Sequence, residues 1–441
     1  MTAKIVAAAR RLLLLLTFAS AFWPVWLWRA VLDDRPIFWA FNSLVVYLPE
    51  AFGLSFVAAM LIELRVMKRA WRWGDKPLTA ILIAMASLGT LSALWALEAR
   101  LALWTAAEWW LVVGTYLSLV NGGERPSTWR ALAPLALLLV GVEAVVGAAQ
   151  VGTGSTLMGR FLLRWETDLR VWEPGASYLL NAAGQPLLRA YGTTEHPNHL
   201  GGYAVVLTLI LLGAWLIESK HGPRQWLWGG GLVAGVALLG LTFSRGGWIA
   251  FAASAFYLLL CGWGKPERVA VALAVGLMGG TAAVFVLLFG PWVIQRVAPP
   301  ADAWLEMNSL RTRALIAQGA WDLFRERPLL GVGLGNYMQG AFIHLSAQVK
   351  VPVHNAMALA ASELGLMGGV LAAGLYARVI WAAWQARANL AAAVGVALLL
   401  ALLVANAFDL YAWGLAPGRL LLGLLCGLGA SDLTGVDSKL T

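Results

Sequence analysis

Apolar runs of about 20 residues, the length that a helix needs to cross a bilayer, recur along nearly the whole chain. They constrain its fold more than any other feature. Of the 441 residues, 60% are hydrophobic and only 12% are charged, which exceeds the apolar share of a soluble domain. The sequence therefore predicts an all-α polytopic membrane protein.

We predict about twelve transmembrane helices from these runs. They lie near residues 12–32, 37–63, 78–97, 101–120, 131–150, 200–218, 226–244, 247–262, 269–294, 355–380, 389–408 and 410–428. Lys and Arg are grouped between alternate runs, for example at Arg65, Lys68 and Arg69, as the positive-inside rule expects of cytoplasmic segments. This alternation predicts that both termini are cytoplasmic.

Two outer segments are too long to be turns, and long ordered loops tend to carry function. The predicted organisation is five helices in residues 1–150, a first long outer loop in 151–199, helices six to nine in 200–294, a second, helical outer loop in 295–354, the last three helices in 355–430 and a cytoplasmic tail in 431–441. In the second loop, Ser309 can cap a helix with an apolar stripe that ends at Pro328. We expect this helix to lie on the membrane face.

Composition excludes several classes of partner. The formal net charge of +9 does not indicate nucleic acid, because the cations sit between apolar runs. Cys261 and Cys426 lie in or beside such runs, so neither a disulfide framework nor a thiolate metal site is expected. Asp33 and Asp34 can be read as metal ligands or as an interfacial acidic pair; the second interpretation is favoured, since no third ligand is evident.

His354 is the strongest candidate for acid–base chemistry. It lies in VPVHNAMALAASELGLMGG, residues 351–369, where a long loop becomes an apolar helix that we predict to run uninterrupted to about Ala377. A histidine changes charge near neutral pH, so it can serve as a general base. The alternative is an interfacial residue that reaches water. Glu363 falls on the opposite side of the helix and therefore needs a separate role.

Arginines on the outer side form the second unusual feature. Arg245 lies in TFSRGGW with no soluble loop around it, and an arginine inside a bilayer costs at least about 2.5 kcal/mol, so it normally faces a cavity or a partner. Arg189, Arg311 and Arg313, taken singly, are equally consistent with solvated loop charges. Their shared side of the membrane favours binding of a phosphate or pyrophosphate, because the guanidinium fork contacts two oxygens at once.

Arginines and a histidine together describe group transfer from an anionic lipid donor. Negative charge grows on the pyrophosphate as its bond to the sugar breaks, and fixed arginines would stabilise that charge. Further substrate-binding candidates are the neighbouring polar residues Asn198, Asn336, Tyr337, Asn355 and Glu363.

Other polar signals are weaker. GVGLGNY imitates a nucleotide-binding loop, but no βαβ unit surrounds it, so we predict a tight turn before Asn336. Glu50, Glu108 and Glu143 lie inside apolar runs, where an acid either has a function or pairs with a cation or a backbone group.

Three stretches resemble the O-antigen ligase family of bacterial inner-membrane glycosyltransferases, which shares a domain with O-antigen polymerases and protein O-oligosaccharyltransferases. They are RAYGTTEHPN at residues 189–198, TFSRGGW at 242–248, and the run from Arg313 through RPLLGVGLGNY to VHNAMALAASELGLMGG. Together these stretches cover roughly residues 185–370.

The resemblance implies a metal-independent, inverting transfer of glycan from undecaprenyl pyrophosphate to lipid A–core oligosaccharide, at the periplasmic face of the inner membrane and without a cofactor. It implies that His354 is the catalytic base, that Arg189 and Arg245 bind pyrophosphate and that Arg313 is an additional contact. It also implies a GT-C-like fold with a periplasmic helical subdomain. Asp33 and Asp34 look like the acidic pair of metal-dependent relatives.

The nearest alternatives are an O-antigen polymerase and a protein O-oligosaccharyltransferase, which differ from a ligase in the acceptor. The outer loops are shorter than an added soluble domain would need, which slightly favours a lipid acceptor. A transporter for the same lipid is the alternative from another class. It should show paired interrupted helices and a midplane ionisable site, whereas here the charges gather at one face.

Overall fold

A computed structural model of the chain describes residues 2–23, 25–33, 39–122, 128–156, 168–218, 222–263, 266–300, 303–344 and 351–437. It contains two compact units. Unit 1 comprises Met1–Pro126, Thr312–Ala386 and Asn406–Thr441, and unit 2 comprises Ser127–Arg311 and Arg387–Ala405.

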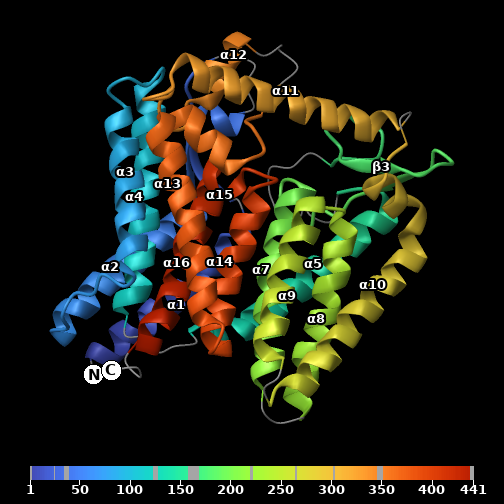
Figure 1. The fold of residues 1–441 in the computed structure, drawn as a ribbon, viewed down its shortest axis with the longest axis horizontal. Helices are drawn as coiled ribbons and strands as arrows, with labels where there is room; N and C mark the ends of the chain where they lie inside the picture. Colours follow the sequence, from blue (N-terminus) through green and yellow to red (C-terminus); the bar gives the residue numbers. More distant parts are fainter. Residues whose placement is uncertain are drawn as a thin grey trace. The chain divides into compact units, whose positions relative to one another are not determined.

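Unit 1 is a helical bundle with a small hairpin. Its elements are α1 (Thr2–Ser20), β1 (Trp26–Val31), η1 (Trp39–Phe41), β2 (Ser43–Tyr47), α2 (Leu48–Met67), α3 (Lys76–Ser92), α4 (Ala99–Asn121), most of α11 (Trp304–Glu326), α12 (Tyr337–His344), α13 (Ala356–Ala386), α15 (Tyr411–Gly414) and α16 (Ala416–Asp437). Helix α4 is central, because it packs against α2, α3 and α16 (Figure 1).

Unit 2 is built around one buried helix. Its elements are η2 (Thr128–Leu132), α5 (Ala133–Thr153), β3 (Tyr178–Leu180), β4 (Pro186–Leu188), α7 (Pro197–Ile217), α8 (Pro223–Thr242), α9 (Arg245–Gly262), α10 (Arg268–Val297), the start of α11 and nearly all of α14 (Leu390–Asn406). Helix α7 is apolar on all sides and packs against α5, α8 and α9, so almost every residue in it is buried.

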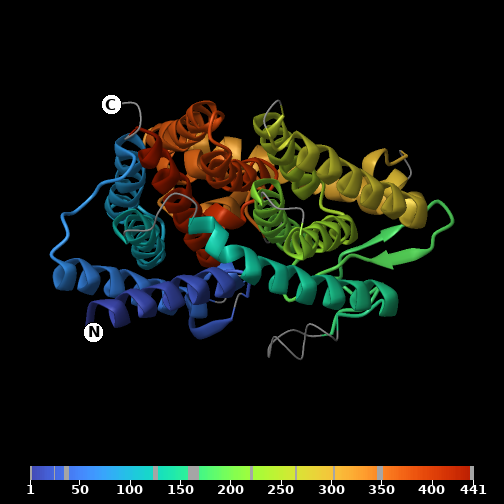
Figure 2. The ribbon, with the colours of Figure 1, turned by 90° about the horizontal axis from the view of Figure 1, so that it is seen from below.

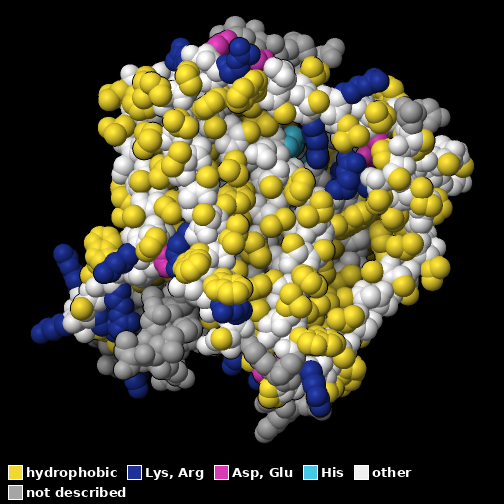
Figure 3. All heavy atoms as spheres, viewed as in Figure 1, with side chains coloured by type: hydrophobic (Ala, Val, Ile, Leu, Met, Phe, Trp, Pro, Cys, Tyr) yellow, Lys and Arg dark blue, Asp and Glu magenta, His cyan; other side chains and the backbone are white. Residues whose placement is uncertain are grey.

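The chain is a multi-pass helical membrane protein, but the prediction of about twelve spans is not confirmed. Among the described residues, six helices are long and apolar enough to cross a membrane: Trp129–Thr153, Pro197–Ile217, Pro223–Thr242, Arg245–Gly262, Arg268–Val297 and Ala356–Ala386. Lys76–Ser92, Leu390–Asn406 and Ala416–Ala430 are apolar but shorter. Hydrophobic side chains cover much of the helical surface in Figure 3, as lipid contact requires.

The first two predicted spans, 12–32 and 37–63, are wrong in their boundaries. Helix α1 ends at Ser20, and β1 then pairs antiparallel with β2, with Trp26 opposite Tyr47. Side chains of β2 alternate between buried and half-buried positions, which is the period of a strand and not of a helix. Hydropathy alone counted these strand residues as parts of spans. Helices α1 and α2 lie side by side (Figure 2).

Of the two long segments, the sequence predicted helices only in the second, residues 295–354. The described part of residues 151–199 carries the antiparallel hairpin β3–β4, visible in Figure 2. Residues 295–354 carry α11 and α12. Helix α11 begins at Trp304, more than a turn before the predicted cap Ser309, and ends at Glu326 before Pro328.

Helix α13 is broken, which corrects the prediction of an uninterrupted helix starting at His354. It begins at Ala356, and Gly365 inside it has φ 65° and ψ −158°. The break frees two carbonyls: Ser362 accepts from the Val332 amide at 3.1 Å, and Glu363 accepts from the Gly333 amide at 2.8 Å. The glycine-rich turn is thereby fixed to the middle of α13.

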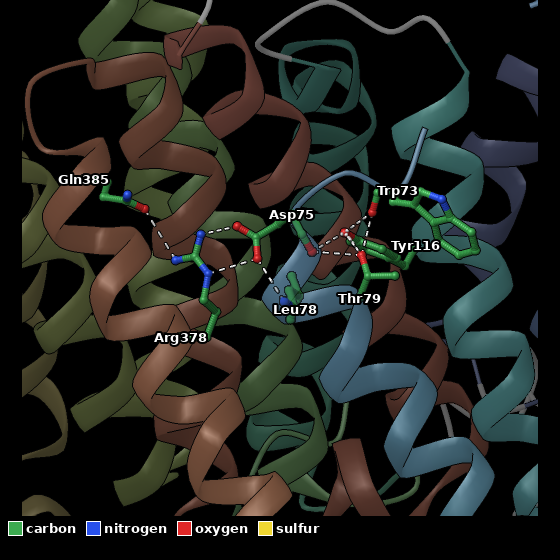
Figure 4. Close-up of polar contacts among 7 residues, drawn as sticks. All are labelled: Trp73, Asp75, Leu78, Thr79, Tyr116, Arg378 and Gln385. Atoms are coloured by element: carbon green, nitrogen blue, oxygen red, sulfur yellow. Dashed lines mark hydrogen bonds and ion pairs between the residues drawn. The ribbon is translucent and has the colours of Figure 1, made fainter. Parts of the chain in front are cut away.

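An ion pair joins the second half of α13 to the start of α3. Arg378 Nε donates to Asp75 Oδ1 at 2.9 Å, and the same oxygen caps α3 by accepting from the Leu78 amide at 2.9 Å (Figure 4). Thr79 and Tyr116 join their hydroxyls at 2.8 Å and thereby connect α3 to α4. Three helices of unit 1 therefore meet in one polar network.

Replacement of Gly365 by alanine is expected to destabilise unit 1. The positive φ disfavours any side chain by about 1–3 kcal/mol, and a Cβ atom would collide with the Leu329 backbone. Thermal unfolding of the purified variants in detergent measures the effect. Gly374→Ala in the same helix is the control, since its Cβ would meet only Ile81 at 3.6 Å. Equal melting temperatures for the two variants would contradict this account of the break.

Candidate donor and base sites

The turn between α8 and α9 organises the polar part of unit 2. Phe243 takes the left-handed conformation with φ 47°, which reverses the chain within two residues, and Ser244 caps α9 by accepting from the Gly247 amide at 3.3 Å. Gly247 allows α9 to approach α7, because a Cβ there would lie 3.3 Å from the Gly201 backbone. The TFSRGGW motif thus builds a tight turn with outward carbonyls.

Arg189 is clamped against this turn. Its Nε donates to the Thr242 carbonyl at 2.8 Å, its Nη1 to Ser177 Oγ at 2.9 Å and its Nη2 to Asn198 Oδ1 at 2.6 Å. The side chain is 4% exposed. All three acceptors are neutral oxygens, so they fix the position of the guanidinium but do not neutralise its charge.

The segment after Arg189 is held by two side chains of α5. Gln150 Oε1 accepts from the amides of Tyr191 and Gly192 at 2.9 and 2.8 Å. Glu143 accepts from the Thr193 amide at 2.9 Å and also from its hydroxyl. Sequence alone left open whether Glu143 has a function or pairs with another group. In the structure it is paired with a backbone amide.

Arg245 belongs to a three-residue charge cluster. Arg296, at the end of α10, donates through Nη1 to both oxygens of Glu306 at 2.6 and 2.7 Å, and its Nε donates to the Phe243 carbonyl at 2.9 Å. Arg245 Nη2 lies 3.4 Å from Glu306 Oε2. We call Arg189, Arg245 and Arg296 the arginine cluster. All three belong to unit 2 and lie next to, or contact, the turn between α8 and α9.

An apolar groove adjoins the arginine cluster. It has a volume of about 830 Å³, within the usual size of a ligand cleft, and lies between α5, α8 and α10. Leu187, two residues before Arg189, and Leu241, next to Thr242, line it. Gly276 and Gly280 leave open space on α10. An apolar chain in this groove would place a charged end near the arginine cluster.

His354 lies in unit 1, two residues before α13. Its Nδ1 is 3.4 Å from Asp409 Oδ1, and its side chain is 23% exposed. Asp409 is buried and also accepts from the Leu410 amide at 2.8 Å. Asn355 caps α13 by accepting from the Ala358 amide at 2.9 Å and donates to the Ala407 carbonyl at 3.0 Å. The segment before α13 is therefore fixed to residues 407–410.

The other predicted substrate contacts in unit 1 are largely buried in the scaffold. Asn336 Oδ1 accepts from the Glu98 amide at 2.6 Å, and Glu363 Oε2 accepts from Trp413 Nε1 at 2.9 Å. Tyr337 donates to the Ile316 carbonyl at 2.9 Å, and burial raises the pKa of its phenol, which keeps it a neutral donor. Gly331, Gly333 and Gly335 have positive φ, which confirms the predicted turn.

Arg311 and Arg313 lie on α11, on either side of the division between the units. Arg311 is exposed and Arg313 is half-buried. Asn198 binds Arg189, as above, and lies in the first turn of α7, which His196 caps by accepting the Asn198 amide at 3.1 Å. The structure thus joins Asn198 to the arginine cluster.

The remaining acids are mostly paired. Glu50 caps α2 by accepting from the Tyr47 amide at 2.7 Å, and Glu108 forms an ion pair with Arg419. Asp33 Oδ1 accepts from Asn42 at 2.9 Å, and Asp34 lies outside the described residues. Within the described ranges, no three His, Cys, Asp or Glu residues gather as a metal site, and Cys261 and Cys426 are both buried and form no disulfide.

Sequence analysis missed three residues of these sites: Arg296, Glu306 and Asp409. Arg296 and Glu306 both lie near the start of the long segment 295–354, and the same reasoning that selected Arg245 could have selected Arg296, an arginine at the end of an apolar run. Asp409 falls between two predicted spans, 389–408 and 410–428, where an acid in so short a connection could have been a signal.

The fold and these sites define a polytopic membrane protein with a cationic site beside an apolar groove. Comparison with protein families identifies residues 230–373 as a match to the O-antigen ligase family, and this match supports the assignment of the chain to that family. The matched region includes Arg245, Arg296, Glu306 and His354. No curated protein matches the chain.

Glu143→Ala is expected to loosen the segment that carries Arg189. Two buried donors of Thr193 would lose their acceptor, at a local cost of about 1–3 kcal/mol. Hydrogen–deuterium exchange of residues 189–194 should become faster. Glu218→Ala is the control, because the Glu218 carboxylate makes a long ion pair, at 3.9 Å, with the exposed Arg224. Unchanged exchange in Glu143→Ala would show that Gln150 alone fixes the segment.

Proposed function

We propose that this protein is an O-antigen ligase that transfers a glycan from undecaprenyl pyrophosphate to lipid A–core oligosaccharide. One observation carries the proposal: the arginine cluster adjoins an apolar groove, and part of both lies within the family match. A lipid diphosphate has this combination of a double anion and a hydrocarbon chain. The proposed location is the bacterial inner membrane, with the reaction at the periplasmic face and a GT-C-like arrangement of helices.

Unit 2 is proposed to bind the donor. The hydrocarbon chain occupies the apolar groove, where each buried methylene contributes about 0.8 kcal/mol. Arg245, Arg296 and Arg189 face the diphosphate end. Fixed guanidinium groups stabilise the charge that grows on the leaving pyrophosphate more than they stabilise the ground state, so they lower the barrier. Arg311 and Arg313 on α11 are proposed as further contacts to donor or acceptor.

Unit 1 is proposed to supply the base. Asp409 orients His354 through Nδ1, which leaves Nε2 to accept the proton of an acceptor hydroxyl. The acceptor oxygen then bonds to the anomeric carbon as the bond from that carbon to the pyrophosphate oxygen breaks. The pyrophosphate leaves with the electron pair of the broken bond. One displacement inverts the anomeric configuration, and the arginines supply the positive charge without a metal ion.

An O-antigen polymerase and a protein O-oligosaccharyltransferase use the same donor chemistry and differ in the acceptor. Lipopolysaccharide from a deletion strain separates these functions: core without polymer indicates a ligase, whereas core carrying one repeat unit indicates a polymerase. A transporter of the lipid-linked glycan would form no glycosidic bond at all.

The proposal is tested by reconstitution of the purified protein with the lipid-linked donor and lipid A–core, in excess chelator and without an ion gradient. Wild-type protein should form ligated product, and His354→Ala should lower the rate by at least about 10²-fold, because a general base contributes on this scale. Equal folding of the variant is checked by thermal unfolding. Wild-type rates in His354→Ala would remove the base assignment, and absence of product with wild-type protein would contradict the ligase.

Arg245→Lys is expected to impair transfer strongly although it keeps the charge. An ammonium group cannot make the paired contacts of a guanidinium to two oxygens. Initial rates at saturating donor measure the loss. Arg224→Lys is the matched control, because Arg224 is 72% exposed at the opposite end of α8. Full activity in Arg245→Lys would indicate that only net charge matters at this position.

A further inference from the structure

Glu306 occupies the place between two arginines where an anionic ligand is expected. Its two oxygens lie 2.6 and 2.7 Å from Arg296 Nη1, and Oε2 lies 3.4 Å from Arg245 Nη2. The Glu306 side chain is 9% exposed. A carboxylate that bridges two guanidinium groups imitates one phosphate group in charge and in the spacing of its oxygens.

The arginines are held by contacts that do not involve Glu306. Arg296 Nε donates to the Phe243 carbonyl at 2.9 Å, and Arg245 Nη1 lies 3.4 Å from the Arg296 carbonyl. Arg245 and Arg296 also share the single carboxylate of Glu306. The contacts to the Phe243 and Arg296 carbonyls do not depend on the carboxylate, and the site gains net positive charge when the carboxylate leaves.

Space for the departing carboxylate exists on the other side of Glu306. A second cavity of about 320 Å³ lies beside β3 and the end of α10, and Glu306 lines it together with Gln295, Asn181 and Trp304. The Gln295 amide can donate a hydrogen bond to a carboxylate there. Glu306 itself borders this cavity, because residues 303–306 form part of its wall.

We propose that Glu306 is an internal counter-anion, which fills the diphosphate position of the empty protein and returns to expel the diphosphate product. The identity of the anion rests on the proposed function. Fixed arginines that stabilise a leaving pyrophosphate also retain it after transfer, and slow product release limits many enzymes. A competing carboxylate weakens binding of the product and leaves the arginines in position for the next donor.

The test compares wild-type protein, Glu306→Asp and Glu306→Gln at full length in detergent, with inorganic pyrophosphate as the probe in isothermal titration. Removal of the competing charge should tighten pyrophosphate binding about tenfold in Glu306→Gln, equivalent to about 1.4 kcal/mol. Glu306→Asp should fall between, because its shorter carboxylate cannot bridge both arginines. In the transfer assay, Glu306→Gln should lower both KM and kcat and show a burst of product.

The direction in which pyrophosphate affinity changes tests whether Glu306 is a competing counter-anion. If Glu306 only braces the arginines, its replacement disorders them and pyrophosphate binds more weakly; weaker or unchanged binding in the variants therefore overturns the inference. If Glu306→Gln cannot be purified folded, the affinity of Glu306→Asp relative to wild-type protein decides in the same way. Tighter binding without any transfer by wild-type protein would instead contradict the proposed function while retaining the counter-anion.

Discussion

Buried guanidinium groups need oxygen acceptors, and in unit 2 the turn between α8 and α9 provides them. Thr242 and Phe243 present adjacent carbonyls to Arg189 and Arg296 because Phe243 is in the left-handed conformation. A helix that continued through this point would have used both carbonyls internally. The positive φ of Phe243 costs conformational energy, and the two charged hydrogen bonds offset that cost. The ring of Phe243 also packs against that of Phe285, with 5.4 Å between the ring centroids.

Unit 1 uses a different interruption for a similar purpose. The break at Gly365 turns the carbonyls of Ser362 and Glu363 toward the glycine-rich turn, while the Glu363 side chain binds Trp413. Glu363 therefore serves as a connector between α13 and the segment near α15, and not as a partner of His354. The turn that leads to Asn336 is held by these backbone hydrogen bonds and by the Asn336 side chain, which accepts from the Glu98 amide.

Sequence alone predicted the membrane class and the tight glycine turn, whereas the functional roles of Arg189, Arg245 and His354 stay predictions. It could not predict the pairings, because Asp409 lies 55 residues from His354, and Glu306 lies ten residues beyond Arg296, before the apolar stripe that indicated a helix. It also misplaced the boundaries of the first two spans, since hydropathy does not separate a buried strand such as β2 from a helix. The break at Gly365 was missed for a related reason: glycine is tolerated within helices, and only the structure shows its positive φ and the closeness of the Leu329 backbone.

The position of α10 bears on how a lipid would arrive. Most of its membrane-crossing part is not buried by the rest of the protein. Gly276 and Gly280, which line the groove, have no side chains to close it. A lipid could therefore slide in sideways from its own leaflet with its chain still surrounded by hydrocarbon. Transfer of the tail from the bilayer to the groove would then change the free energy little. The protein would distinguish one lipid from another by its headgroup, through the few charged side chains that contact it.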